Sequence, residues 1–174
     1  MNPSFSIKRS WPDSATPDHE KQICFHGKGL LMHHLMMFTI DDKQYAIDLF
    51  VVQRVVRAAA LTPLTDVPET IAGLINVRGE ILPVINMRIC LNLPEKELEP
   101  SHQFIIASTS RQKVALWVDS VIDVRVLSEE EIVGRDAILP DTGQVDGAVI
   151  CHDGMVLIYN LEHLLDGFVL SDFM

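Results

Sequence analysis

The stretch Leu74-Ile-Asn-Val-Arg-Gly-Glu-Ile-Leu-Pro-Val-Ile-Asn86 joins two apolar runs through a short charged turn, Arg78-Gly79-Glu80. Apolar, β-branched runs on both sides of a tight turn predict a pair of strands, 73–77 and 81–86. Gly79 supplies the backbone freedom that such a turn requires, so turn geometry alone does not call for a cation beside it. Arg78 is therefore either a solvated turn charge or a binding residue.

Similar patterns recur along most of the chain. Alternating or continuous apolar runs separated by Asp, Gly, Ser and Asn predict further strands, and most of these strands pair as hairpins. The predicted strands outside the first pair are 35–40, 44–48, 51–57, 104–108, 113–118, 121–127, 145–151 and 155–159. About ten short strands with few helices predict an all-β fold of two small barrels, because a single open sheet of that size is uncommon.

Domain organisation follows from composition. Residues 1–34 are rich in turn-forming residues and lack an apolar period, so we predict a flexible tail there and a folded domain over residues 35–170. A polar, proline-bounded loop predicts the seam between the two barrels near residues 92–102. Four of the seven histidines, His19, His26, His33 and His34, fall in the predicted tail, and their spacing matches no metal-binding motif.

Charge and hydropathy exclude several classes of protein. The formal net charge is −10, and residues 1–35 carry four basic and three acidic side chains, which leaves ten basic against 21 acidic side chains in the body. Such a body repels nucleic acid and anionic membrane surfaces. No apolar run has the roughly 18 residues needed to cross a bilayer, so we expect a cytoplasmic protein without membrane insertion.

Motifs of enzymes and metal sites are missing from the sequence. It contains no phosphate-binding loop, nucleophile elbow, zinc-protease motif or paired C-x-x-C. Asp119 with Asp123 and His152 with Asp153 are the best polar pairs, and structural roles explain both more simply. We therefore expect no enzymatic activity, no cofactor and no metal.

Several motifs, taken together and in order, resemble the CheW-like domain family. The N-x-R-G turn, the I-x-P-V strand after it and the V-D-x-V segment are each weak alone, but the combination is specific. The resemblance spans residues 35–165 and rests on Phe38–Ile40, Tyr45–Asp48, Ile71–Gly79, Ile81–Ile85, Met87-Arg88, Val118–Val124 and Leu157–Leu165.

The resemblance implies two side-by-side barrels of the SH3-like type and a non-catalytic adaptor role. Members of this family link the cytoplasmic tips of chemoreceptors to the regulatory domain of a CheA-type histidine kinase, in arrays at the inner face of the membrane. It also implies receptor contacts at Arg78, at Gly73 and at Val52 on a neighbouring strand. Kinase contacts are implied at barrel ends in both subdomains, without assigned residues.

One position departs from the family pattern. Where the family commonly has an acidic residue, this chain reads Val52-Gln-Arg-Val55, so Arg54 adds a second cation to the expected receptor site. If Arg54 lies near Arg78, the pair favours an acidic partner surface. This leaves open a specialised chemosensory system, such as one for type IV pilus motility, and also a fragment of a larger signalling protein or a barrel that binds a small ligand or oligonucleotide.

Overall fold

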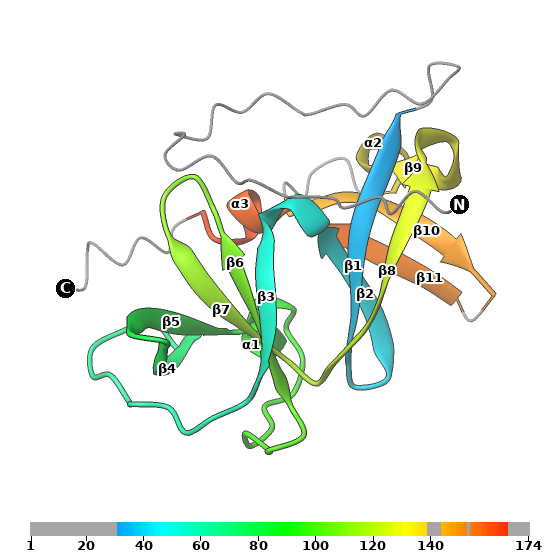
Figure 1. Ribbon diagram of the computed structural model, residues 1–174. Coiled ribbons are helices and arrows are strands. Elements are labelled where there is room, and N and C mark those ends of the chain that lie inside the picture. Colours follow the sequence, from blue (N-terminus) through cyan, green and yellow to red (C-terminus); the bar gives the residue numbers. More distant parts are fainter. Residues whose placement is uncertain (1–30, 139–143, 153, 167–174) are drawn as a thin grey trace, which may run out of the picture.

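The computed structural model describes residues 31–138, 144–152 and 154–166, and it arranges them as two β-sheets packed side by side (Figure 1). Sheet A has the strand order β8-β1-β2-β11-β10-β9, and sheet B has the order β3-β6-β7-β5-β4. The strands of sheet A are β1 (Met32–Ile40), β2 (Lys43–Asp48), β8 (Ser120–Ser128), β9 (Ile132–Gly134), β10 (Val145–Cys151) and β11 (Gly154–Tyr159). The strands of sheet B are β3 (Val52–Arg57), β4 (Ile71–Val77), β5 (Glu80–Asn86), β6 (Gln103–Ser108) and β7 (Lys113–Val118).

Short helices connect or flank these strands. They are η1 (Leu49–Val51), α1 (Met87–Cys90), η2 (Glu129–Glu131), α2 (Arg135–Ile138) and α3 (Leu161–Leu164). The Asn160 side chain accepts a hydrogen bond from the backbone N–H of His163 and so caps α3. None of the helices among the described residues has the length and apolar character of a membrane-crossing segment.

The predicted seam near residues 92–102 is wrong. That loop joins α1 to β6, and the strands before and after it both belong to sheet B. The chain passes between the sheets at η1 and again at Asp119, so all of sheet B is inserted between β2 and β8. The sequence hides these crossings because each is one to three residues long, whereas the exposed loop has the composition of a linker.

The predicted end of the tail also needs correction. Strand β1 begins at Met32 and pairs with the end of β8, with Met32 opposite Ser128. His33 and His34 therefore belong to a strand of sheet A, while residues 1–30, with His19 and His26, lie outside the described residues. The other predicted strands agree with the structure to within three residues at each end.

The two sheets are joined by a shared core. Phe38, Ile47, Ile85 and Leu116 are at most 1% exposed and belong to one cluster that contains residues from both sheets. A separate cluster fills the interior of sheet A alone, and Leu35 and Met37 of β1 belong to it. Strand β1 is thus apolar on both faces. We call the face that packs on the interior cluster of sheet A the inner face of the sheet. The opposite face, which packs on the shared core, is called the outer face of sheet A.

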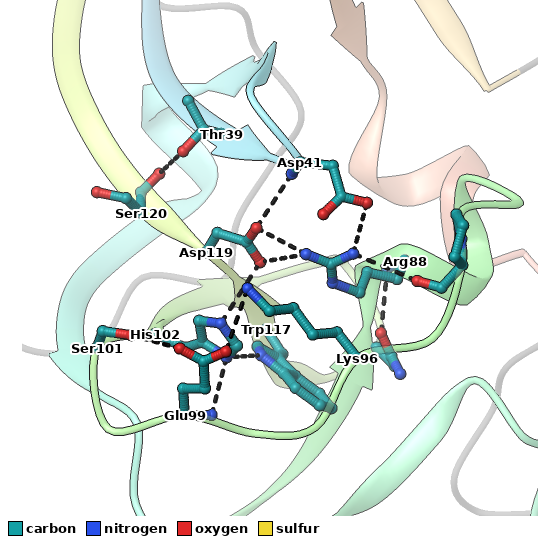
Figure 2. Close-up of polar contacts among 12 residues, drawn as sticks. Thr39, Asp41, Arg88, Lys96, Glu99, Ser101, His102, Trp117, Asp119 and Ser120 are labelled. Carbon is teal, nitrogen blue, oxygen red and sulfur yellow. Dashed lines mark hydrogen bonds and ion pairs between the residues drawn. The ribbon is translucent and has the colours of Figure 1, made fainter.

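A buried arginine holds the junction between the sheets (Figure 2). Arg88 of α1 is 2% exposed. Its Nη2 donates to both carboxylate oxygens of Asp119, at 2.8 and 2.7 Å, and its Nη1 donates to Oδ2 of Asp41 at 2.7 Å. Asp119 also accepts a hydrogen bond from the Asp41 backbone N–H at 3.0 Å. The hydrogen bond from Arg88 lowers the pKa of Asp41, and the hydrogen bond to Asp41 raises the pKa of Arg88.

A buried histidine extends this junction. Nδ1 of His102 accepts hydrogen bonds from the Trp117 indole N–H and from the Glu99 backbone N–H, both at 3.1 Å. Nε2 of the same ring lies 3.8 Å from Oδ1 of Asp119, which is beyond hydrogen-bond distance. His102 therefore links the loop before β6 to Trp117 of β7.

We predict that Asp119→Ala destabilises the protein far more than Asp41→Ala. Asp119 accepts three hydrogen bonds and its side chain is 20% exposed, whereas the Asp41 side chain is 41% exposed. Removing Asp119 leaves Arg88 buried with one carboxylate, at a cost of about 3 kcal/mol. Urea denaturation of both variants at neutral pH measures the difference, and equal losses would contradict this assignment.

The Asp41 contribution should also depend on pH. Because the folded protein lowers the pKa of Asp41, this contribution is present above the unfolded-state pKa of about 4 and is lost as the pH falls through the folded-state pKa. The stability difference between wild type and Asp41→Ala should therefore shrink on acidification. A difference that grows below pH 4 would show that the carboxylate of Asp41 is not stabilised in its ionised form.

Candidate functional site

The predicted receptor residues Arg78 and Val52 lie at the same end of sheet B. Strands β3, β5 and β7 begin at this end, and β4 and β6 finish there, because β5 and β7 are parallel and the other neighbours are antiparallel. An ion pair of 2.8 Å between Lys113 and Glu80 joins the first residues of β7 and β5. The turn that contains Arg78 and the start of β3 therefore lie at the same end of sheet B.

Arg78 occupies a costly backbone conformation. Its φ is 55° and that of Gly79 is 89°, so both central residues of the turn are left-handed, where the sequence led us to expect only glycine to be unusual. The Asn76 side chain accepts a hydrogen bond of 2.8 Å from the Gly79 N–H and fixes the turn. Glycine, asparagine or aspartate is usual at such a position, and another residue costs about 1 kcal/mol. This cost favours a role for the arginine side chain beyond turn formation.

The Arg78 side chain is exposed at the tip of this fixed turn. Within the part of the chain that the structure describes, it forms no hydrogen bond or ion pair, although the protein carries a net charge of −10. Its five N–H donors are therefore open to a partner. A rigid turn with a free guanidinium loses little conformational entropy when it binds a carboxylate or backbone carbonyl groups.

Gly73 does not join this surface. It is buried, has a φ of 148°, and lies at a register shift between β4 and β5. A Cβ atom at this position would lie 2.6 Å from the carbonyl oxygen of Thr62, whose backbone pairs with Leu74. The resemblance implied a receptor contact at Gly73, but close packing of the chain on itself explains the glycine, and its burial argues against direct contact.

Val52 and Arg54 lie on β3, which is an edge strand of sheet B. Val52 is half-buried against the shared core. Arg54 is also half-buried, is opposite Ile106 of β6, and has no ion pair among the described residues. The proximity of Arg54 to Arg78 stays a prediction, because β3 and β4 are at opposite ends of the strand order of sheet B.

The structure adds an exposed apolar stripe that sequence reasoning did not identify. Ile122, Val124 and Val126 of β8 are 49%, 41% and 49% exposed, and we call them the β8 stripe. Val124 is opposite Met36, which belongs to the shared core, so the stripe continues the outer face of sheet A beyond the region that sheet B covers. An alternating pattern predicts a half-buried strand, but it cannot tell whether the apolar face is covered by the same chain or by a partner.

Charged residues on β8 indicate how a partner can pack there. Strand β8 is an edge of sheet A, and its alternate residues Asp123 and Arg125 are opposite Met37 and Leu35, on the inner face. Charged side chains that point inward from an edge strand oppose the addition of another strand. We therefore expect a partner to pack against the face of the β8 stripe as a helix does, without extending the sheet.

Other reactive side chains occur among the described residues. Among the described residues, no group of three or more His, Cys, Asp and Glu side chains could hold a metal ion. Burial raises the pKa of Cys90 to about 11, and it also raises the pKa of Tyr45 and Tyr159, so these groups are protonated at neutral pH.

We predict that Gly73→Ala lowers the free energy of unfolding, and that the folded variant binds the receptor with the affinity of wild type. A side chain at Gly73 meets a backbone oxygen and requires a left-handed backbone, so we expect a loss of about 2 kcal/mol. Gly134→Ala is the matched control, because Gly134 has open space around its Cβ direction. Thermal and urea denaturation of both variants provide the test. Wild-type stability in Gly73→Ala would refute the packing explanation and restore Gly73 as a contact residue.

Comparison with known proteins adds independent findings. A family model described as the CheW-like domain matches residues 34–168. The chain is 26% identical over 125 residues to "Chemotaxis protein CheW" of Rhizobium meliloti (strain 1021), which covers 67% of this chain and 81% of that protein. It is 35% identical over 98 residues to "Chemotaxis protein CheW" of Bacillus subtilis (strain 168), which covers 56% of this chain and 63% of that protein.

A solved structure supports the fold. The crystal structure of scaffolding protein TtCheW from Thermoanaerobacter tengcongensis matches with a TM-score of 0.70 and 29% sequence identity, over 78% of this chain and 94% of that chain. The expected all-β fold with two small barrel subdomains is thereby confirmed.

Proposed function

This chain belongs to the CheW-like domain family, and from that premise we propose that it is a non-catalytic adaptor of bacterial chemosensory signalling. It couples the cytoplasmic tips of chemoreceptors to the regulatory domain of a CheA-type histidine kinase. The observation that carries the proposal is the exposed Arg78 guanidinium, which a strained and rigid turn presents without a partner among the described residues. A coupling protein needs such a preformed contact because it works by binding alone.

The receptor surface that we propose combines Arg78, Val52 and Arg54 with the β8 stripe. The arginine binds carboxylate or carbonyl oxygens of a receptor helix, and the stripe supplies apolar contact area. Val52 and the stripe both adjoin the junction of the two sheets, since Val52 packs on the shared core and the stripe continues the same outer face.

The kinase contacts in this proposal lie at barrel ends in both subdomains, apart from the receptor surface. An adaptor that binds both partners at once requires separate surfaces, and a fold of two sheets is compatible with them. Simultaneous binding places the protein in arrays at the inner face of the membrane, and repeated contacts of this kind support higher-order assembly.

Arg54 favours an alternative form of the proposed function, in which the protein is the coupling protein of a specialised chemosensory system. Arg54 has no ion pair among the described residues, and on the receptor-facing strand it selects a more acidic receptor tip than a carboxylate at this position would select. A chemosensory system for type IV pilus motility is one candidate, and the acidity of the cognate receptor tip distinguishes the alternatives.

We predict that Arg78→Ala weakens receptor binding about thirtyfold, which corresponds to about 2 kcal/mol for an arginine at an interface centre. Arg78→Lys should recover only part of the affinity, because an ammonium group keeps the charge without the planar fork. Folding stability should change by less than about 0.5 kcal/mol, since the side chain is exposed. Calorimetric titration against a receptor-tip fragment and, separately, against the kinase regulatory domain measures these effects.

Arg57→Ala is the matched control for this titration. Arg57 is an exposed arginine at the last position of β3, at the opposite end of sheet B. We expect Arg57→Ala to bind the receptor fragment like wild type. The proposal fails if Arg78→Ala loses affinity equally for both partners, or if Arg57→Ala is as defective as Arg78→Ala.

We predict separately that Arg54→Glu reduces affinity for the native receptor tip by more than Arg54→Gln does. Reversing the charge adds repulsion from an acidic partner, whereas the neutral variant only removes attraction. The same receptor titration at low and high salt provides the measurement, since salt should diminish the difference. Tighter binding by Arg54→Glu would show that the receptor tip is not acidic opposite this strand.

A further inference from the structure

Helix α3 is attached to the turn that joins β6 and β7, and Figure 1 shows the two side by side. The Glu162 carboxylate accepts hydrogen bonds from the backbone N–H and from the hydroxyl group of Ser110. Nη1 of Arg111, in the same turn, lies 3.7 Å from Oδ1 of Asp166 and forms an ion pair with it. Asp166 is the last described residue. The chain therefore leaves the described structure at the end of sheet B where β7 begins.

The face of sheet B that packs on the shared core is uncovered at this end. Side chains alternate along a strand, so Ile81 lies on the same face of β5 as Ile85, which belongs to the shared core. Ile85 is 1% exposed, whereas Ile81 is 66% exposed. Leu74 of β4 is opposite Pro83 of β5, so it lies on this face too, and it is half-buried. We call Ile81 and Leu74 the hairpin patch.

Helix α3 packs on the same side of sheet B as the hairpin patch. Three leucines in and directly after this helix belong to the shared core together with Ile85: Leu161, Leu164 and Leu165. A chain that continues beyond Leu165 therefore starts on the side of the sheet where the hairpin patch is open.

The free arginine of the β4–β5 turn adjoins the hairpin patch. Arg78 precedes Ile81 by three residues and has no ion pair among the described residues. Strands β5 and β7 are neighbours, about 4.8 Å apart, and Lys113 and Glu80 at their first positions form an ion pair of 2.8 Å. An open apolar patch and an unpaired cation thus lie a few strand spacings from the point where the chain leaves at Asp166.

The sequence that follows Asp166 is complementary to both features. It reads Gly-Phe-Val-Leu-Ser-Asp-Phe-Met over residues 167–174. Five of its eight side chains are large and apolar, and its one charged side chain is the anion Asp172. An extended chain spans about 3.4 Å per residue, so Asp172 can lie up to about 20 Å from Asp166. This reach covers several strand spacings, and a short tether gives the segment an effective concentration of about a millimolar or more.

We propose that residues 167–174 dock on the hairpin patch of their own chain, with their apolar side chains over Ile81 and with Asp172 paired to Arg78. Removal of apolar side chains from water and a charge-assisted contact both favour this docking. The segment then covers the guanidinium that the proposed function assigns to the receptor. A receptor must displace the segment, so its affinity is reduced by the fraction of molecules in which the turn is free. Only this last consequence rests on the proposed function.

The test compares three full-length proteins. They are wild type, a triple variant that carries Phe168→Ser, Leu170→Ser and Phe173→Ser, and the variant Ser171→Ala. Serine keeps the length of the segment and removes its apolar side chains. Ser171→Ala is the matched control, because it changes a polar side chain in the middle of the same segment.

The first measurement is the NMR spectrum of each isotope-labelled protein, without any receptor. We expect the methyl resonances of Ile81 and the side-chain N–H resonance of Arg78 to shift in the triple variant and to stay unchanged in Ser171→Ala. Ile150 of β10 is 77% exposed and serves as the reference that no variant shifts. Wild-type positions of both resonances in the triple variant would overturn the proposal. Shifts in wild type that depend on protein concentration would show docking on a second copy, and would also overturn it.

The second measurement is calorimetric titration of the same proteins with a helical-hairpin fragment of the cognate chemoreceptor tip. We expect the triple variant to bind the fragment about threefold or more tightly than wild type and Ser171→Ala, because its Arg78 turn is free in all molecules. Equal affinities of the three proteins would overturn the competition between segment and receptor. A fragment that binds none of them overturns the proposed function, whereas the spectra alone decide whether the segment docks.

Discussion

The buried guanidinium of Arg88 is the interaction on which the arrangement of the two sheets depends. It binds the β1–β2 turn through Asp41 and the crossing between β7 and β8 through Asp119. Arg88 itself lies in helix α1, which follows strand β5 of sheet B. A buried charge requires all of its partners at once, since removal of one leaves an uncompensated ion. One side chain therefore sets the position of a turn, a crossing and a helix that are distant in sequence.

This junction explains why the proposed receptor surface is preformed. The chain leaves sheet A at η1 and returns to it at Asp119, so β3 and β8 begin at the two crossings that flank sheet B. The shared core packs behind the start of β3 and beside the β8 stripe. A surface supported in this way needs little rearrangement when it binds, which lowers the entropic cost of docking.

Local features of this fold could be predicted from the sequence, and long-range features could not. Period-two patterns and tight turns depend on neighbouring residues, so the hairpins, the Asn160 cap and the exposed Arg78 turn were all predictable. The structural role of Asp119 could not be specified from sequence because its partner, Arg88, is 31 residues away. The close packing at Gly73 was not predictable because Thr62 approaches it from another segment of the chain. The β8 stripe escaped notice because only the tertiary structure shows which apolar face stays uncovered.

The central claim is that one continuous surface, from the Arg78 turn across the start of β3 and η1 to the outer face of β8, receives the receptor. The most direct test is the chemical-shift perturbation of isotope-labelled protein by an unlabelled receptor-tip fragment. The account predicts that the shifted resonances gather in residues 50–54, 76–81 and 122–126, and that β9, α2 and the β10–β11 hairpin stay unchanged. Perturbations centred on β9 and β10, with the Arg78 turn unaffected, would contradict it.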